Sequence, residues 1–177
     1  MAGHNKWSQI KRKKEVTDAK KSQVFSKLAR LITLESRKAG GDLNSPGLRA
    51  VIEKARSYNM PGDNIERAVK KGVEKSEENL EAIIYEAYGP GGVALIIEAL
   101  TGNRNKAASE IKHILSENDA SLGAIGSTLW AFTKTREGWL PQTTIEVSPE
   151  DKEKIETLCE TLEDNEEVQE VYTNLKN

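Results

Sequence analysis

The segment AIIYEAYGPGGVALIIEALT, residues 82–101, decides the fold of the second half of the chain. Its two arms, Ala82–Tyr88 and Val93–Thr101, are together rich in Ile, Val and Tyr, which favour β-strands. Between them, Gly89–Gly92 reads GPGG, a composition typical of a tight turn. A glycine-rich turn can also cradle a phosphate, but this one lacks the spacing of a phosphate-binding loop and leads into a strand rather than a helix. We therefore expect a β-hairpin.

Two helices and three further strands are expected after the hairpin. One helix runs from Asn103, whose side chain can cap it, to about Asn118. The other begins at Ser148-Pro149, a capping Ser followed by a Pro. The strands are Gly126–Thr133, Gln142–Val147 and Val168–Thr173. From Val93 onward this order is β-α-β-β-α-β, the split βαβ or ferredoxin-like arrangement, preceded by one extra strand.

The first half of the chain has the 3.6-residue periodicity of helices. We expect helices at about Asp18–Ala39, from Ser45-Pro46 to Tyr58, and from Asp63 to Gly72. Gly40 can adopt the left-handed conformation that ends the first helix, and Asp63–Glu66 reads as a capping box for the third. The predicted fold class is α+β: residues 1–76 form a basic arm and a three-helix basic domain, and residues 77–177 form an acidic ferredoxin-like domain with an antiparallel sheet.

Charge is distributed unevenly along the chain. The whole sequence of 177 residues has a net charge of −2. Residues 1–76, however, contain 18 Lys and Arg against 8 Asp and Glu, a net +10, while residues 77–177 contain 8 against 20, a net −12. Such asymmetry indicates a nucleic-acid or membrane partner for the basic half. The acidic half can limit indiscriminate binding to polyanions or face a basic protein.

Several protein classes are disfavoured by the sequence. The single Cys159 excludes an internal disulfide and fits a reducing compartment. No apolar run approaches the roughly 18 residues that a membrane span needs. The basic N-terminus has no hydrophobic stretch of the kind found in secretory signals. An organellar transit peptide is disfavoured because the basic run continues into a patterned helix. We therefore expect a cytoplasmic protein that does not bind membranes.

The segment Gly3–Arg30 carries the strongest functional signal. It holds nine Lys and Arg against Glu15 and Asp18, a net +7, with Trp7 just ahead of the basic run. Cations with an aromatic among them suit a polyanion whose bases can stack. The candidate nucleic-acid contacts are Lys6, Trp7, Lys11, Arg12, Lys13, Lys14, Lys20, Lys21, Lys27 and Arg30.

Two other interpretations of this basic segment are open. A charge run is most often a solvated face, but Lys11–Lys14 has no acid within it, and like charges repel unless a partner neutralises them. A basic amphipathic helix can also lie on an anionic membrane. The apolar face of this helix is needed to bury it in its own domain, which disfavours the membrane.

Catalytic and metal-binding chemistry finds little support. His4 and His113 have no second His or Cys at metal-ligand spacing. The carboxylates of Glu150–Glu170 are spread along a helix and its end, as on a solvated face. Asn103 and Arg104 open a helix whose free N–H groups favour an anion, so they are a second, weaker candidate for a phosphate contact. We expect no metal, no cofactor and no enzymatic activity.

The start of the chain, MAGHNKWSQIKRKKEVTDAKKSQVFSKLAR at residues 1–30, resembles the start of the YebC/PmpR family, which includes the mitochondrial translational activator of cytochrome c oxidase. The similarity continues through AGGDLNSPGLRAVIEKARSYNMPGDNIERAVKKG, YEAYGPGGVALIIEALTGNRNKAASEIKHIL, GSTLWAF and LEDNEEVQEVYTNL. These motifs are specific and follow one another in order over most of the chain.

This resemblance implies a regulator of gene expression without enzymatic activity. The family is associated with two roles: DNA-binding transcriptional regulation, and a ribosome-associated translation factor that relieves stalling, for example on proline runs. The basic N-terminal region is the expected nucleic-acid contact in both. A second family motif, which we interpret as structural or as part of a ribosomal contact, includes Met60, Pro61, Asp63, Asn64, Ile65 and Arg67.

The sequence departs from the family pattern at one place. Typical members carry a third α/β domain after the equivalent of Ala131-Phe132, whereas here only Thr133–Pro141 bridges Phe132 to the next expected strand. The resemblance therefore implies a short form. The target operator or message and the oligomeric state stay open, as does the choice between DNA and ribosomal RNA. A hydrolase of nucleic acid is the third hypothesis, and it would need a carboxylate cluster or a metal site.

Overall fold

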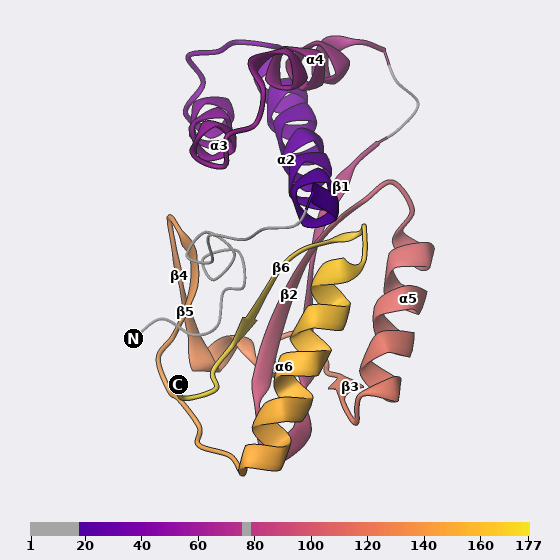
Figure 1. The fold of residues 1–177 in the computed structure, drawn as a ribbon, viewed down its shortest axis with the longest axis vertical. Helices are drawn as coiled ribbons and strands as arrows, with labels where there is room; N and C mark the ends of the chain where they lie inside the picture. Colours follow the sequence, from indigo (N-terminus) through magenta and orange to yellow (C-terminus); the bar gives the residue numbers. More distant parts are fainter. Residues whose placement is uncertain (1–17, 76–78) are drawn as a thin grey trace. The chain divides into compact units, whose positions relative to one another are not determined.

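The computed structural model describes residues 18–75 and 79–177. Over these residues the fold is α+β, as the sequence predicted, with helices in the first half and an antiparallel sheet with two helices in the second (Figure 1). The chain divides into two units between Leu80 and Glu81. The helical unit here denotes residues 18–75 with 79–80, and the sheet unit denotes residues 81–177.

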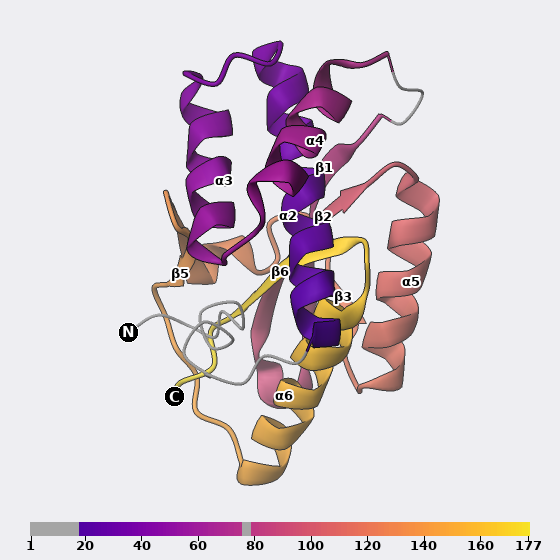
Figure 2. The same cartoon turned by 45° about the horizontal axis from the view of Figure 1, so that its top comes forward.

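Three helices make up the helical unit: α2 (Asp18–Ala39), α3 (Pro46–Ser57) and α4 (Gly62–Val73). α2 contacts both of the others (Figure 2). Their inward faces follow the 3.6-residue period and bury apolar side chains, which include Leu28, Ile32, Leu48, Ile52, Ala55, Ile65 and Ala68. Removing this apolar surface from water is the main force that holds three short helices together.

α2 and α4 approach each other closely where small residues meet. The Ser36 hydroxyl donates to the carbonyl of Val69 at 2.7 Å, and the Thr33 hydroxyl lies 3.3 Å from the carbonyl of Ala68. A Cβ atom on Gly72 would lie 2.6 Å from Ser36 Cβ and 2.7 Å from the backbone oxygen of Thr33. Only glycine fits this crossing, so Gly72 fixes the distance between the two helices.

Most of the predicted helix boundaries are confirmed. α2 ends at Ala39, and Gly40 follows it with a φ of +59°. The predicted capping box at Asp63–Glu66 is wrong, because α4 already begins at Gly62, and Pro61 precedes it without a side-chain capping bond. Proline fixes its own φ near the value that a helix start needs, so the helix begins one residue before the expected cap.

The sheet unit contains two helices and six strands. They are β1 (Glu81–Tyr88), β2 (Ala94–Thr101), α5 (Arg104–Glu117), β3 (Ser121–Leu122), β4 (Phe132–Thr135), β5 (Gly138–Pro141), α6 (Pro149–Asp164) and β6 (Val168–Thr173), with 3-10 turns at Pro90–Gly92 and Leu129–Ala131. Four strands form an antiparallel sheet in the order β3-β1-β2-β6, and β4 pairs with β5 separately.

The predicted hairpin of β1 and β2 is confirmed. The Gly89 N–H donates to the Val93 carbonyl at 2.9 Å and the Gly92 N–H to the Gly89 carbonyl at 3.1 Å. Gly91 and Gly92 have φ values of +72° and +79°, a region that side chains strongly disfavour. Asn103 and Ser148 cap α5 and α6 as expected, since each side chain accepts a hydrogen bond from the third N–H that follows it.

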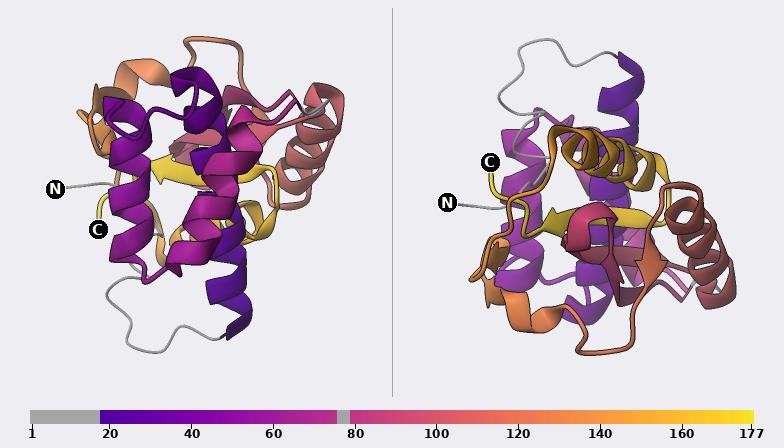
Figure 3. Two further views of the ribbon diagram at one scale, coloured as in Figure 1. Left: turned by 90° about the horizontal axis from the view of Figure 1, so that it is seen from above. Right: turned by 90° about the horizontal axis from the view of Figure 1, so that it is seen from below.

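The two faces of the sheet are buried by different elements. α5 and α6 cover one face (Figure 3), where Ile111, Leu115, Ile155 and Leu158 pack against Leu95, Ile97 and Val171. On the other face Phe132 and Trp139 of the β4–β5 hairpin pack against Ala94, Ile96 and Tyr172. A Cβ on Gly138 would lie 2.3 Å from the Tyr172 hydroxyl oxygen, so the turn of this hairpin fits closely against β6.

The fold class is confirmed, but two of the predicted strands are wrong over most of their length: of Gly126–Thr133, only Phe132 and Thr133 lie in a strand, β4. In Gly126–Thr133 the N–H groups of Gly126, Thr128 and Leu129 bind the side chain of Glu86, so they cannot join a ladder. In Gln142–Val147 only Ile145 forms a bridge, with Leu175. The place that the split βαβ arrangement gives to its third strand is taken by β1, the strand expected to be extra. None of the helices that the structure describes is long and apolar enough to cross a membrane.

Candidate nucleic-acid interface

The helical unit is strongly basic where the structure describes it. Residues 18–75 contain 13 Lys and Arg against 7 Asp and Glu, a net +6. Two of the acids form ion pairs with neighbouring cations, Glu35 with Lys38 at 3.1 Å and Glu53 with Arg49 at 3.5 Å. The sheet unit has the opposite balance, with 8 Lys and Arg against 18 Asp and Glu, a net −10. A polyanion is therefore attracted to the helical unit and repelled by the sheet unit.

Two of the predicted contact residues, Lys20 and Lys21, lie in the first turn of α2 and are exposed. They follow directly on the basic run of the sequence. Long, exposed ammonium groups can reach phosphates without any change in the helix. Both side chains are therefore accessible from solvent, and their contact with nucleic acid stays a prediction.

Two others are less accessible. Lys27 is only 4% exposed, and Arg30 is half-buried. Each of them has an interaction partner within the protein. A buried ammonium has no access to a phosphate, so we leave Lys27 out of the proposed interface. The remaining predicted contacts lie outside the described residues: Lys6, Trp7, Lys11, Arg12, Lys13 and Lys14.

The exposed face of α4 adds cations that the contact prediction from the basic segment did not include. Arg67, Lys70 and Lys71 are exposed, while Ile65 and Ala68 are buried on the opposite side of the helix. Spacings of three and four residues place the cations on one face, so the period of the sequence could have identified them. α4 crosses α2 near Thr33, about 20 Å along the helix from Lys20 at 1.5 Å per residue.

The second family motif divides between core and surface. Met60 and Ile65 are buried, whereas Pro61, Asp63 and Arg67 are exposed. Asn59 precedes the motif with a φ of +60°, and the Met60 N–H closes the end of α3 by donating to the Ala55 carbonyl at 3.1 Å. The buried members thus hold the turn between α3 and α4. Arg67 is the exposed cation of the motif and is accessible to a ligand.

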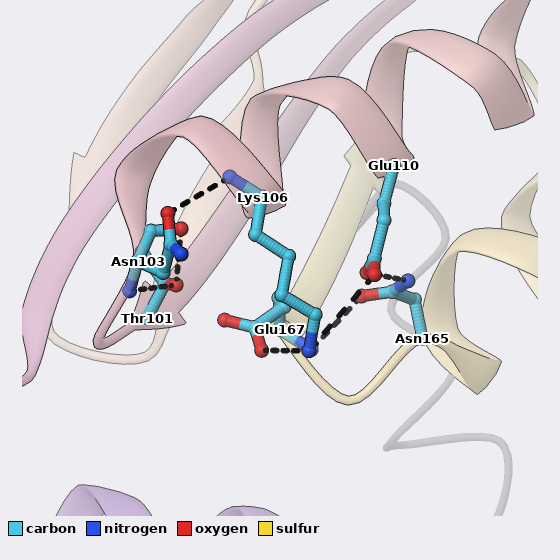
Figure 4. Close-up of polar contacts among 6 residues, drawn as sticks. All are labelled: Thr101, Asn103, Lys106, Glu110, Asn165 and Glu167. Carbon is cyan, nitrogen blue, oxygen red and sulfur yellow. Dashed lines mark hydrogen bonds and ion pairs between the residues drawn. The ribbon is translucent and has the colours of Figure 1, made fainter.

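The weaker candidate for a phosphate contact lies at the start of α5, at Asn103 and Arg104. The helix N-terminus there already binds side chains of the protein itself (Figure 4). The side-chain oxygen of Asn103 accepts from the Lys106 N–H at 3.1 Å, and the Asn103 N–H donates to Thr101 at 2.9 Å. Arg104 lies 3.7 Å from Glu81. Two more acids are close, because the Lys106 ammonium is 3.5 Å from Glu167 and 3.9 Å from Glu110. These carboxylates oppose a phosphate, so Asn103 and Arg104 are not part of the interface that we propose.

No metal-binding group stands out in residues 18–75 and 79–177, where no three His, Cys, Asp or Glu side chains are placed to hold an ion. His113 lies 3.4 Å from Glu117 on the exposed side of α5. Cys159 is buried on the apolar side of α6.

Two family models together match nearly the whole chain. A family model described as "TACO1/YebC protein N-terminal domain" matches residues 5–75. A second, described as "TACO1/YebC second and third domain", matches residues 80–137 and 134–175. The two matched segments of the second model meet at the turn between β4 and β5.

Many curated proteins are similar to this chain. A "Probable transcriptional regulatory protein" of Thermoanaerobacter pseudethanolicus is 38% identical over 239 residues, which cover 99% of this chain and 97% of that protein. A protein of the same name from Halothermothrix orenii is 46% identical over 165 residues, covering 92% of this chain and 63% of its own. The crystal structure of a conserved hypothetical protein from Aquifex aeolicus superposes with a TM-score of 0.86 at 30% identity, covering 97% of this chain and 96% of that one.

These alignments also show where this chain lacks a segment that a relative has. The alignment with the Thermoanaerobacter protein is 239 residues long, whereas this chain has 177 residues. The relative therefore carries a segment that this chain lacks, and the split match of the second model places its absence at residues 134–137. There the relative's extra segment is replaced by the tight β4–β5 hairpin. With both models matched in order and relatives aligned from end to end, the chain belongs to the TACO1/YebC family.

Proposed function

We propose that this protein is a non-enzymatic regulator of gene expression that binds nucleic acid through its helical unit and the basic segment that precedes it. The observation that carries the proposal is the segregation of charge, a net +6 in residues 18–75 against −10 in residues 81–177. The relatives' printed name, probable transcriptional regulatory protein, supports the same class of function.

The binding is electrostatic in the first place. Lys11, Arg12, Lys13 and Lys14, together with exposed Lys20 and Lys21, contact phosphates and release the counterions condensed on them. Trp7 stacks on an unpaired base. Arg67, Lys70 and Lys71 on α4 give a second set of phosphate contacts. Contacts to phosphates position a protein on its ligand but carry no direct sequence information.

Ribosomal RNA is the second candidate ligand beside duplex DNA, and one observation favours it. A helix that reads the major groove uses side chains such as Asn and Gln against base edges. The exposed side chains of α4 are Asp63, Glu66, Arg67, Lys70, Lys71 and Val73, and its one amide side chain, Asn64, is half-buried. Folded RNA is recognised largely by its shape and through its phosphates, so binding it does not require base-reading side chains on this surface.

The test is co-sedimentation with purified ribosomes at physiological salt, with competitor duplex DNA in a parallel tube. The variant changes Lys11, Arg12, Lys13 and Lys14 to Ala. If the wild type pellets with ribosomes despite excess DNA and the variant stays in solution, translation is the main role. If DNA draws the wild type off, transcription is the main role. A variant that binds both ligands as well as the wild type would contradict the proposed interface.

A further inference from the structure

The loop between β3 and β4, residues 123–130, binds the buried carboxylate of Glu86 through its backbone N–H groups. We call residues 123–130 the Glu86 loop. Oε1 of Glu86 accepts from the N–H groups of Thr128 at 2.8 Å and Leu129 at 2.9 Å, and Oε2 accepts from the Gly126 N–H at 2.6 Å. The Thr128 hydroxyl lies 3.1 Å from Oε1 and is the fourth hydrogen-bond donor to this carboxylate. Glu86 itself is 5% exposed.

Further hydrogen bonds fix both ends of this loop. The Gly123 N–H donates to the backbone carbonyl of Glu86 at 2.8 Å. The Ser127 carbonyl accepts from the Tyr88 hydroxyl at 2.5 Å and from the indole N–H of Trp130 at 2.8 Å. The loop is thereby ordered before any partner arrives, which reduces the conformational entropy lost on binding.

This ordered loop presents large apolar side chains to water. Ile125 is 98% exposed and Trp130 is 59% exposed. Both belong to Ala120–Thr133, the longest stretch of the chain without a charged residue. An isoleucine held fully in solvent on a rigid backbone gains nothing for the fold, whereas rigid aromatic and apolar anchors are typical of the residues that dominate protein interfaces.

The inner side of the loop is not available to a phosphate. Its N–H groups already surround the Glu86 carboxylate, so the cradle that such a loop could offer an anion is filled. The surrounding unit has a net charge of −10 and repels nucleic acid. The same charge opposes association of two copies of the sheet unit. A basic protein is the partner that this charge attracts.

We propose that the Glu86 loop is a docking element that inserts Ile125 and Trp130 into an apolar pocket on a basic protein. The sheet unit as a whole, with its net charge of −10, supplies the complementary charge. This assigns a separate partner to the sheet unit, while the helical unit binds nucleic acid. This docking proposal rests on the proposed function only for the choice of probes, which are the ribosome and RNA polymerase.

The test introduces a photoreactive side chain, Ile125→benzoylphenylalanine, in the full-length protein. The protein is irradiated with purified ribosomes and, in a second tube, with purified RNA polymerase. Adducts are treated with ribonuclease and identified by mass spectrometry. We expect an adduct with a basic protein of one of the two complexes. An adduct with RNA alone, an adduct with a second copy alone, or no adduct with either complex overturns the proposal.

Affinity measurements on the complex that gives the adduct provide the second readout. Ile125→Asp should weaken binding by about five-fold or more, as loss of an anchor residue does, and Ile125→Leu should retain it. Leu140→Asp is the matched control, because it places the same charge on an exposed apolar side chain of the sheet unit outside the Glu86 loop. Equal effects of Ile125→Asp and Leu140→Asp would also overturn the proposal. Failure of the proposed function is scored separately, by the Lys11–Lys14 variant, which leaves the Glu86 loop unchanged.

Discussion

Glu86 and Thr128 lie 42 residues apart in the sequence and are joined by two hydrogen bonds, from the Thr128 N–H at 2.8 Å and from its hydroxyl at 3.1 Å, both to the same carboxylate oxygen. Both residues are buried. The Thr128 hydroxyl is also 3.1 Å from the carbonyl of Leu95 on β2. This pair ties the Glu86 loop to the centre of the sheet, and it explains why a carboxylate is tolerated in a largely apolar strand.

The first prediction is that Glu86→Gln destabilises the sheet unit by about 2 kcal/mol, since an amide NH₂ would then face backbone N–H groups that need an acceptor. Glu86→Ala should cost more, because it leaves all of these donors without a partner. Urea denaturation followed by tryptophan fluorescence measures the change. Glu81→Gln, on the exposed end of the same strand, is the control and should have little effect. If Glu86→Gln unfolds like the control, the loop does not depend on this carboxylate.

The second prediction concerns pH. Burial raises the pKa of Glu86, but the hydrogen bonds from Thr128, Gly126 and Leu129 outweigh burial and hold the pKa below its ordinary value. A carboxylate with a lowered pKa in the folded state stabilises the fold above its unfolded-state pKa, and this stabilisation is lost as the pH falls through the folded-state pKa. The stability difference between wild type and Glu86→Gln should therefore be constant near neutral pH. It should shrink below about pH 4. A difference that stays the same in acid would contradict this account.

The third prediction tests the crossing of α2 and α4. Gly72→Ala should destabilise the helical unit by about 1–3 kcal/mol, the usual cost of overpacking, since the added Cβ would lie 2.7 Å from the Thr33 backbone oxygen. Gly62→Ala is the matched control: it lies in the same helix, and a Cβ there has nothing within 4 Å. Thermal unfolding followed by circular dichroism at 222 nm separates the two. Equal melting temperatures for both variants would show that the helices can move apart freely.

The sequence was sufficient where local signals decide the structure. Periodicity placed α2 and the inward faces of α3 and α4, and the Asn103 and Ser148 caps marked the starts of α5 and α6. The GPGG turn identified the central hairpin. In each of these cases the residues that form the element lie within a few positions of one another, so the pattern alone contains the information.

The errors arose where distant residues decide. Gly126–Thr133 has the uncharged, apolar composition of a strand, but Glu86, about 40 residues earlier, binds its N–H groups. Lys27 lies among basic residues in the sequence and was expected to be exposed, yet it is buried. Nothing in the local pattern of either segment reports its tertiary partner. The candidate site shares this difficulty, because the accessibility of each cation depends on packing that the sequence does not display.

The fourth prediction addresses the basic face of α4. Changing Arg67, Lys70 and Lys71 to Ala should weaken nucleic-acid binding at every sequence tested and flatten the log–log salt dependence. The expected change in slope is about 0.9 for each lost contact on duplex DNA and about 0.7 on single strands. Fluorescence anisotropy with labelled oligonucleotides at four or more salt concentrations gives the slope. The control changes three exposed cations of the sheet unit, Lys112, Arg136 and Lys152, and should leave it unaltered. If the control flattens the slope as much as the α4 variant does, total charge rather than this face decides binding.

The fifth prediction distinguishes base stacking from simple charge attraction. Trp7→Ala should weaken binding to single-stranded oligonucleotides by about 1–3 kcal/mol, the usual contribution of an aromatic ring stacked on a base, and leave the salt slope unchanged because no cation is lost. Trp7→Phe should restore part of the affinity, since it keeps a ring. Anisotropy with single strands, matched to a duplex of the same length, measures the effect. If Trp7→Ala lowers the melting temperature of the protein and leaves the salt-corrected affinity as it was, the indole packs on the protein itself and the stacking assignment is wrong.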